Sequence, residues 1–368
     1  MRRTFAVRVL CLFCFAIFSS VSLAADAFSV YRGASSLGRG HAGLAGSEDV
    51  DAIFYNPAAL LANKEEENRE RLVLFSPMPE VSRNISSVIA KVQDDSDSEK
   101  VSLVDDLVKT PLFVGFSNFS GIIANRFAIG IVTSAFARAF AFKDLEFSGL
   151  ETVDFKAFTN LGLITSYAHD VYEGVWVGGT LKYLDRTQVT ASLNLSDIKE
   201  IKELSIDNYR NKGKGYGLDV GSIYRPPLLQ GESYRTQFAL TVDDVGETQF
   251  AKTEKDGPPL ESIKQTINLG ATFAWLWDGT KLTFHGDYRD LLSNNETNSF
   301  KNLHLGLDFS LAEKVGLALG LNQGYPTASV FFGGKFVRLY IGSYGEEQGK
   351  KVGDRPDVRF FTRLSLSV

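Results

Sequence analysis

The stretch LHLGLDFSL, residues 303–311, alternates between apolar and polar positions along its whole length. One face would carry Leu303, Leu305, Leu307, Phe309 and Leu311, and the other His304, Gly306, Asp308 and Ser310. Successive side chains of a β-strand point to opposite faces, so this period of two predicts a strand with one apolar and one polar surface. The final stretch VRFFTRLSLSV, residues 358–368, repeats the pattern. Both a soluble sandwich and a transmembrane barrel are built from such strands.

The number and length of candidate strands favour the barrel. All but the first are nine residues or longer, against about 5 or 6 in ordinary sheets, and a tilted transmembrane strand needs about 9–11. We predict fourteen strands, at residues 72–78, 111–119, 126–138, 154–169, 173–191, 213–226, 232–245, 265–277, 280–290, 301–311, 314–322, 325–336, 337–345 and 355–367.

The connections between these strands alternate in length. The long, charged ones are residues 79–110, 139–153, 192–212, 246–264 and 346–354, whereas the others are as tight as VYEG, WDGT, AEK and GGK. Bacterial outer-membrane barrels have an even strand number, short periplasmic turns and longer external loops. The sequence therefore predicts an all-β fold, a 14-stranded antiparallel transmembrane β-barrel over residues 72–368, in the outer membrane of a Gram-negative bacterium. A soluble sandwich is the alternative.

Composition supports a chain in contact with outer-membrane lipid. Beyond residue 24 no apolar run approaches the roughly 20 residues of a membrane-spanning helix, and aromatic residues make up 12% of the chain. Acidic residues outnumber Lys and Arg by 44 to 39. This balance argues against a nucleic-acid partner, because phosphates need offsetting positive charge.

The first 24 residues have the layout of a secretory signal peptide. A basic start, Met1-Arg2-Arg3, precedes the ten-residue apolar run VLCLFCFAIF, and the small residues Ser22 and Ala24 are placed for cleavage. Both cysteines lie in this segment. The remaining chain would then form neither a disulfide nor a thiolate metal site.

The first long loop, residues 79–110, has apolar residues at helical spacing. They are Val81, Ile85, Val88, Ile89 and Val92, followed by Leu103, Val104, Leu107 and Val108. This spacing predicts short amphipathic helices in an external loop, either as a cap on the barrel rim or as a landing site for an apolar ligand. The intervening DDSDSE, residues 94–99, lacks the spacing of a calcium loop, and we predict no metal site and no cofactor.

A glycine-rich run, GRGHAGLAG at residues 38–46, precedes the first strand. Gly38, Gly40 and Gly43 have the spacing of a dinucleotide-binding turn, but such a turn must follow a buried strand. The preceding ADAFSVYRGASS is too polar and too small for one. We instead predict that residues 25–71 form a plug inside the barrel, in which Asn56-Pro57-Ala58 fixes an extended turn.

The same run resembles the hatch of the FadL-type family of outer-membrane long-chain fatty-acid and aromatic-hydrocarbon transporters. The matching residues are Gly38, Gly40, Gly43, Asn56, Pro57 and Ala58, within GRGHAG and DAIFYNPAAL. The resemblance implies a plugged barrel that passes hydrophobic small molecules such as long-chain fatty acids. Residues 316–349 are similar to a related branch, the escort barrels of the type 9 secretion system. This similarity implies an alternative role, a protein-escort or scaffold barrel whose partner is a secreted protein or a secretion complex.

Two groups of side chains are candidates for the barrel interior. Phe116, Phe119, Phe136, Phe140 and Phe142 would either line an apolar pocket or face lipid. The polar faces of two predicted strands carry a cluster, which consists of His285, Asp287, Arg289, His304 and Asp308.

If the connecting hairpin turns near residue 295, Asp287 lies opposite His304, and such a pair could activate water. Lumens are polar by default, however, and the neighbouring Arg289 and Asp308 fit an ordinary charge network. We therefore predict no catalytic residues and no enzymatic activity.

Overall fold

The computed structural model describes residues 29–63, 70–93, 105–108, 110–143, 151–194, 209–253, 259–294, 298–312, 314–334, 336–349 and 351–368. The predicted signal peptide lies outside these residues, as does DDSDSE. The strands are β1 (Arg71–Phe75), β2 (Met78–Ser82), β3 (Leu112–Ile123), β4 (Phe127–Lys143), β5 (Glu151–Tyr172), β6 (Val175–Asn194), β7 (Arg210–Tyr224), β8 (Tyr234–Asp243), β9 (Phe250–Lys252), β10 (Thr266–Trp277), β11 (Thr280–Tyr288), β12 (Leu303–Leu311), β13 (Val315–Asn322), β14 (Tyr325–Gly333), β15 (Val337–Glu347) and β16 (Pro356–Ser367).

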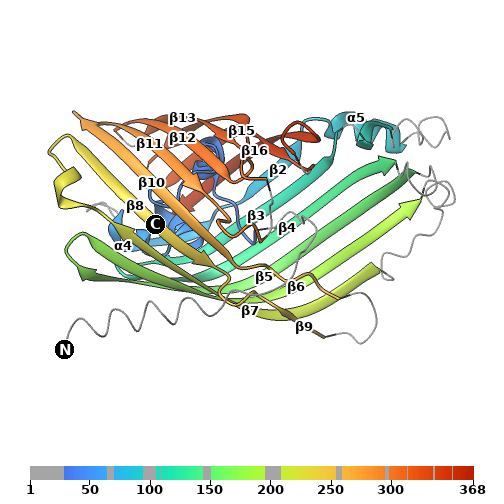
Figure 1. Ribbon diagram of the computed structural model, residues 1–368, viewed down its shortest axis with the longest axis horizontal. Helices are drawn as coiled ribbons and strands as arrows, with labels where there is room; N and C mark the ends of the chain where they lie inside the picture. The colour runs from blue at the N-terminus through green and yellow to red at the C-terminus, as the bar shows by residue number, and fades with distance from the viewer. Residues whose placement is uncertain are drawn as a thin grey trace.

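These strands form one closed antiparallel sheet. β1 and β2 each pair with both β3 and β16, so they are two halves of one wall strand. β8 and β9 both pair with β7 and likewise form a single wall strand. The described residues therefore make a barrel of fourteen wall strands, as predicted (Figure 1).

The first wall strand is broken at Ser76 and Pro77, between β1 and β2. Proline has no N–H to donate to a neighbouring strand, so a break or an edge suits it. Asn118 of β3 repairs the gap, since its side-chain oxygen accepts a hydrogen bond of 2.8 Å from the Ser76 N–H. The wall stays closed at this point through a side chain.

Alternation in the strands separates a lipid-facing surface from the lumen. On β16, Val358 and Phe360 are exposed, whereas Arg359, Phe361 and Arg363 are buried inside the cylinder. The apolar side of LHLGLDFSL also faces outward. A closed barrel with an apolar exterior belongs in the bacterial outer membrane.

Aromatic side chains lie on the outer surface near the strand ends that meet at short turns. They include Tyr167, Tyr172, Tyr234, Trp275 and Trp277. Such girdles mark the level of the lipid headgroups. No helix among the described residues is both long and apolar enough to cross a membrane.

The wall is much taller on one side than on the other. β4 to β7 contain 17, 22, 20 and 15 residues, and β11 to β14 contain 9, 9, 8 and 9. About nine residues suffice to span the membrane. The taller strands therefore project beyond it at the end of the barrel that carries helix α5, Ile85–Gln93 (Figure 1).

Two predicted external loops differ from the structure. The loop expected at 79–110 begins later, because residues 78–82 form β2 although Pro77 and Pro79 indicate a turn. It carries helix α5 (Ile85–Gln93) and a helical turn at residues 105–108. The loop expected at 246–264 contains β9, and its residues 259–263 fold into the barrel.

Candidate functional site

The N-terminal segment, residues 29–63, lies inside the barrel (blue in Figure 1). It contains three short helices, α2 (Ala34–Gly38), α3 (Asp49–Tyr55) and α4 (Ala59–Ala62). Its small residues Ala34, Ala42 and Ala45 are fully buried, and so is Ile53. The next described residues, Glu70 and Arg71, lead into the wall, with Arg71 already in β1.

The GRG turn of this segment docks on strands β12 to β14. Thr327 of β14 accepts a hydrogen bond from the Gly40 N–H and donates one to the Gly38 carbonyl, each at 2.8 Å. Gly40 has a φ of 74°, which glycine adopts without strain. Gly320 in the wall leaves room for it, since a Cβ there would lie 2.3 Å from the Gly40 nitrogen. The backbone of the N-terminal segment thus contacts the backbone of β13 at two glycines, Gly40 and Gly320.

Asp287 and Arg289 of the predicted polar cluster bind the same run of backbone. Asp287 accepts hydrogen bonds from the N–H groups of Gly43 and Leu44, at 2.7 and 3.1 Å. Arg289 donates to the His41 carbonyl at 2.6 Å. A buried loop must satisfy its backbone groups, and wall side chains do so here.

The remaining cluster residues complete this contact. Asp308 lies 2.7 Å from Arg39 and 3.0 Å from the Nε2 of His285. The Nδ1 of His304 lies 3.1 Å from the Gly40 carbonyl oxygen. The structure thus brings together all five residues of the predicted cluster, together with Gly38, Gly40 and Gly43.

Asp287 and His304 are cross-strand neighbours, as predicted from the hairpin. Their side chains nevertheless bind the N-terminal segment rather than each other. One carboxylate oxygen of Asp287 and the Nδ1 of His304 thus hold backbone, which is a positioning role.

Asn56, Pro57 and Ala58 dock on the opposite wall. The Asn56 amide donates to the carbonyls of Leu44 and Ser222, at 3.0 and 3.1 Å, and its oxygen accepts from the Ala58 N–H at 3.1 Å. Gly178 of β6 faces Pro57, where a Cβ would lie 2.5 Å from the Pro57 carbonyl carbon. The glycines of the wall were not anticipated from the sequence, although a glycine inside a strand signals close approach of another backbone.

The lumen wall has two chemically different halves. The apolar half is the part of β3 to β8 beside α3 and α4, which packs against them mainly through Phe119, Ala128, Val132, Ile164, Leu184 and Ile223. Elsewhere the same strands bury polar side chains such as Lys182 and Asp219. The polar half, on β10 to β14, faces the GRG turn mainly with Thr272, Thr283, His285, Asp287, His304, Asp308, Thr327 and Ser329. The N-terminal segment lies between them.

The predicted phenylalanines divide between the two surfaces of the wall. Phe119 and Phe136 are buried inside, whereas Phe116 is exposed on the lipid side. Phe140 is half-buried, and the Phe142 side chain lies outside the described set. Strand register, which decides the face, cannot be read from the residue type alone.

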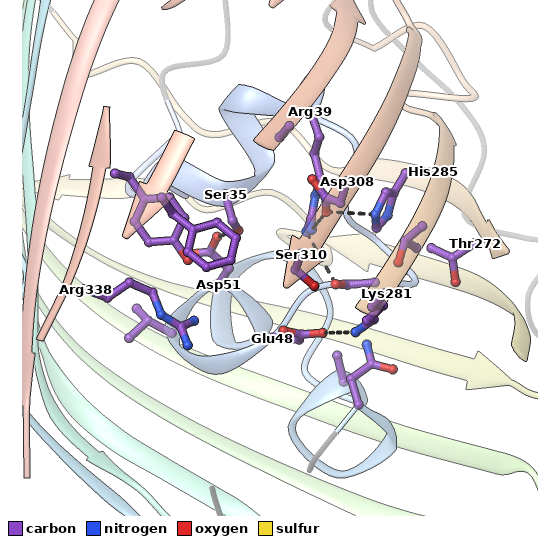
Figure 2. A pocket seen from close by; sticks show the side chains of 18 of the residues that line it. Ser35, Arg39, Glu48, Asp51, Thr272, Lys281, His285, Asp308, Ser310 and Arg338 are labelled. Atoms are coloured by element: carbon purple, nitrogen blue, oxygen red, sulfur yellow. Dashed lines mark hydrogen bonds and ion pairs between the residues drawn. The ribbon is translucent and has the colours of Figure 1, made fainter. Parts of the chain in front are cut away.

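A cavity of about 550 Å³ adjoins the N-terminal segment at the end with the short turns (Figure 2). Its lining is mixed in charge, because three ion pairs cross or border it: Arg39 with Asp308, Lys281 with Glu48 at 2.8 Å, and Arg363 with Asp51 at 2.9 Å. Arg363 also donates to Ser76 at the break in the wall. This side chain therefore joins helix α3 to the broken strand, a link that the sequence did not reveal.

Neither a known protein-family model nor a curated protein matches the chain in sequence. Among solved structures, the chain is similar to the toluene transporter TbuX of Ralstonia pickettii, at 10% identity and a TM-score of 0.48, over 92% of this chain and 98% of that one. It is also similar to the monoaromatic hydrocarbon channel CymD, at 13% sequence identity and a TM-score of 0.47, over 92% of this chain and 98% of that channel. A FadL homologue of Pseudomonas aeruginosa is similar at 12% sequence identity and a TM-score of 0.41, over 91% of this chain and 97% of the homologue.

Identities and TM-scores this low do not transfer a substrate to the chain. The closed barrel itself is established by the strand pairing.

Proposed function

We propose that this protein passes hydrophobic small molecules across the outer membrane, and that the N-terminal segment is the plug that closes the route. The observation that carries the proposal is the position of this segment between a polar and an apolar wall. Hydrogen bonds and ion pairs hold it on one side. On the other side it packs mainly on an apolar surface, with a few hydrogen bonds to the wall, such as that from Asn56 to the Ser222 carbonyl.

The apolar half of the lumen supplies the surface that a hydrophobic molecule needs. Phe119, Ile164 and Leu184 face the interior there, and Phe54 and Trp176 pack against the same cluster. Each CH₂ that leaves water gains about 0.8 kcal/mol. An apolar solute can therefore replace the contacts between α3 and this wall, whereas it cannot replace those of the polar half.

The substrate range follows from the same reasoning. Long-chain fatty acids are one candidate, from the sequence resemblance. Monoaromatic hydrocarbons are another, because TbuX is a toluene transporter and CymD a monoaromatic hydrocarbon channel. Both classes have an apolar body that fits the same half of the lumen. We infer that the protein is a transporter rather than an enzyme.

Uptake by intact cells tests the proposal. Cells that carry the chain and cells that lack it are compared for uptake of labelled toluene, labelled oleate and a polar tracer of similar size. We expect faster uptake of at least one apolar tracer and an unchanged polar tracer. For each tracer, uptake could instead be the same in cells that carry the chain and in cells that lack it. That result, together with a secreted protein that co-purifies at one copy per barrel, would contradict transport and support the escort role.

A further inference from the structure

Strand β7 shows where the membrane ends on the tall side of the wall. Its burial alternates residue by residue, so every second side chain points out of the barrel. These outward side chains run from Tyr224 at the short-turn end through Val220 and Leu218 to Tyr216, which is 76% exposed. The eight residue steps between the two tyrosines cover about 26 Å of tilted strand, or roughly 20 Å of height, against an apolar band of about 25 Å in such barrels. Tyr216 therefore marks the far edge of the apolar band.

A second aromatic residue lies at the same level. Tyr183 of β6 is the cross-strand neighbour of Tyr216, and the centres of the two rings lie 5.2 Å apart. Aromatic side chains gather at both boundaries of the membrane. The girdle described above lies at the short-turn end, so this pair belongs to the opposite boundary, which faces the outside of the cell.

Beyond Tyr216 the outward positions of β7 are all basic. They are Lys214, Lys212 and Arg210, and the intervening residues point into the lumen. Asp185 of β6 lies directly opposite Lys214 and offsets one of the three positive charges. The outer surface just above the apolar band thus carries an excess of positive charge.

We propose that Lys214, Lys212 and Arg210, here called the basic file, bind the phosphate groups of an outer-leaflet lipid. Lysine and arginine are the usual partners of phosphate. The lipid's acyl chains would lie against Val220 and Leu218 on the same face of the same strand, so the protein presents apolar, aromatic and cationic groups in the order in which an anionic lipid needs them. The site is independent of the transport proposal, because it lies outside the barrel and a transported solute passes within.

The height of the wall explains why the site lies on this side. β11 to β14 have only 8 or 9 residues, about the length needed to span the membrane. β6 and β7 stay paired beyond the aromatic level, from Asp185 opposite Lys214 to Val189 opposite Arg210. The cations therefore project from paired strands rather than from a loop, and less conformational entropy is lost when a ligand binds to groups held in this way.

Native mass spectrometry of the purified full-length barrel in detergent, without added divalent cations, tests the site. The probes are lipid A with two phosphates and the same lipid after its phosphates are removed. We expect Lys212→Gln/Lys214→Gln to lower the affinity for phosphorylated lipid A about thirtyfold, because two cations are lost. Lys212→Arg/Lys214→Arg keeps both charges and should keep the affinity. Dephosphorylated lipid A should bind weakly and equally to all variants.

Asp185→Asn should change the affinity in the opposite direction. It removes the carboxylate opposite Lys214, so phosphorylated lipid A should bind about fivefold more tightly. Arg235→Gln/Lys314→Gln is the matched control, because both residues are exposed at the short-turn end and the change removes two positive charges there. It should leave the affinity unchanged. Heat-modifiable migration on gels shows which variants have folded, and Asp185→Asn alone suffices for the test.

Three results would overturn the site. One is an unchanged affinity for phosphorylated lipid A in either the folded Lys212→Gln/Lys214→Gln protein or the folded Asp185→Asn protein. Another is equal binding of phosphorylated and dephosphorylated lipid A to the wild type. The third is complete competition by inorganic pyrophosphate at the concentration of the lipid, which would assign the basic file to a free anion rather than to a lipid.

Discussion

The two halves of the lumen wall hold the same segment by different means. The polar half relies on directional bonds to backbone, such as those of Asp287 and Thr327. The apolar half combines packing around Ile164 and Leu184 with a few hydrogen bonds, such as that from Thr180 to the Ile53 carbonyl. Hydrogen bonds are lost when donor and acceptor move apart by a small distance. Apolar packing tolerates such displacements, and an apolar solute can take the place of the packed side chains. We infer that the polar half keeps the plug in register and that the apolar half is where a solute passes.

The largest expected effect comes from Gly320→Ala in the polar half. Its new Cβ would lie 2.3 Å from the Gly40 nitrogen, and backbone cannot yield as a flexible side chain does. The GRG turn should leave the wall, and ion conductance in planar bilayers should rise severalfold. Gly286→Ala is the control, because its nearest neighbour would be a Leu305 side-chain atom at 3.7 Å. Equal conductance in the two variants would contradict a tight backbone contact.

The next effect should come from Asp287→Ala. This change leaves the N–H groups of Gly43 and Leu44 without their acceptor, at about 1–3 kcal/mol for each buried group. We expect small polar antibiotics to enter cells faster, with the amount of barrel unchanged. Asp278→Ala, in the tight turn between β10 and β11, is a matched removal of a carboxylate away from the segment. Antibiotic entry at the wild-type rate would show that Asp287 does not hold the plug.

A smaller effect is expected from acidification. Burial lowers the pKa of the His41 imidazole well below its usual range, and the nearby Arg289, His304 and Arg32 act in the same direction. Tyr55 also faces the ring, at 5.6 Å. A released segment would bind a proton that the docked one excludes, so docking weakens as the pH falls below about 6.5.

Conductance should therefore rise modestly as the pH falls below about 6.5, the usual pKa of a free imidazole. His41→Gln should remove this rise while the conductance at neutral pH stays low. A rise of the same size in both proteins would assign the pH response to other groups.

The smallest effect on conductance is expected in the apolar half, from Leu184→Ala. This side chain is fully buried, and its loss should cost about 2–5 kcal/mol of stability. The barrel should lose its heat-resistant gel form at a lower temperature, but ions should still be excluded because the polar contacts remain. A leak as large as that of Asp287→Ala would show that the two halves do not differ in the way proposed.

The sequence was informative about features that depend on the pattern within one strand or on the lengths of the connections between strands. The structure buries His304, on the polar face of 303–311, and it buries Arg359 and Arg363, on the polar face of 358–368. The lengths of the connections correctly indicated a closed wall of fourteen strands.

The failures all involve contacts between distant parts of the chain. Gly320 matters because Gly40 approaches it, and nothing near either residue in the sequence indicates this. The polar and charged character of residues 246–264 suggested an external loop, yet Glu261 finds Lys156 and Gln188 inside. The sequence left open whether Phe116 lines a pocket or faces lipid, and the register of β3, which depends on its neighbours, turns it to lipid.

The central claim, that residues 29–63 close the lumen, is tested most directly by the conductance of Asn56→Leu in planar bilayers. The Asn56 side chain makes three hydrogen bonds to backbone groups, and leucine of similar size makes none. The hydrogen bonds that join one wall strand to the next do not involve this side chain, so the barrel should fold in normal amounts. We predict an open, ion-conducting barrel for Asn56→Leu and closed ones for wild type and for Asn302→Leu, which alters a buried wall asparagine. Wild-type conductance in a correctly folded Asn56→Leu barrel would contradict the claim.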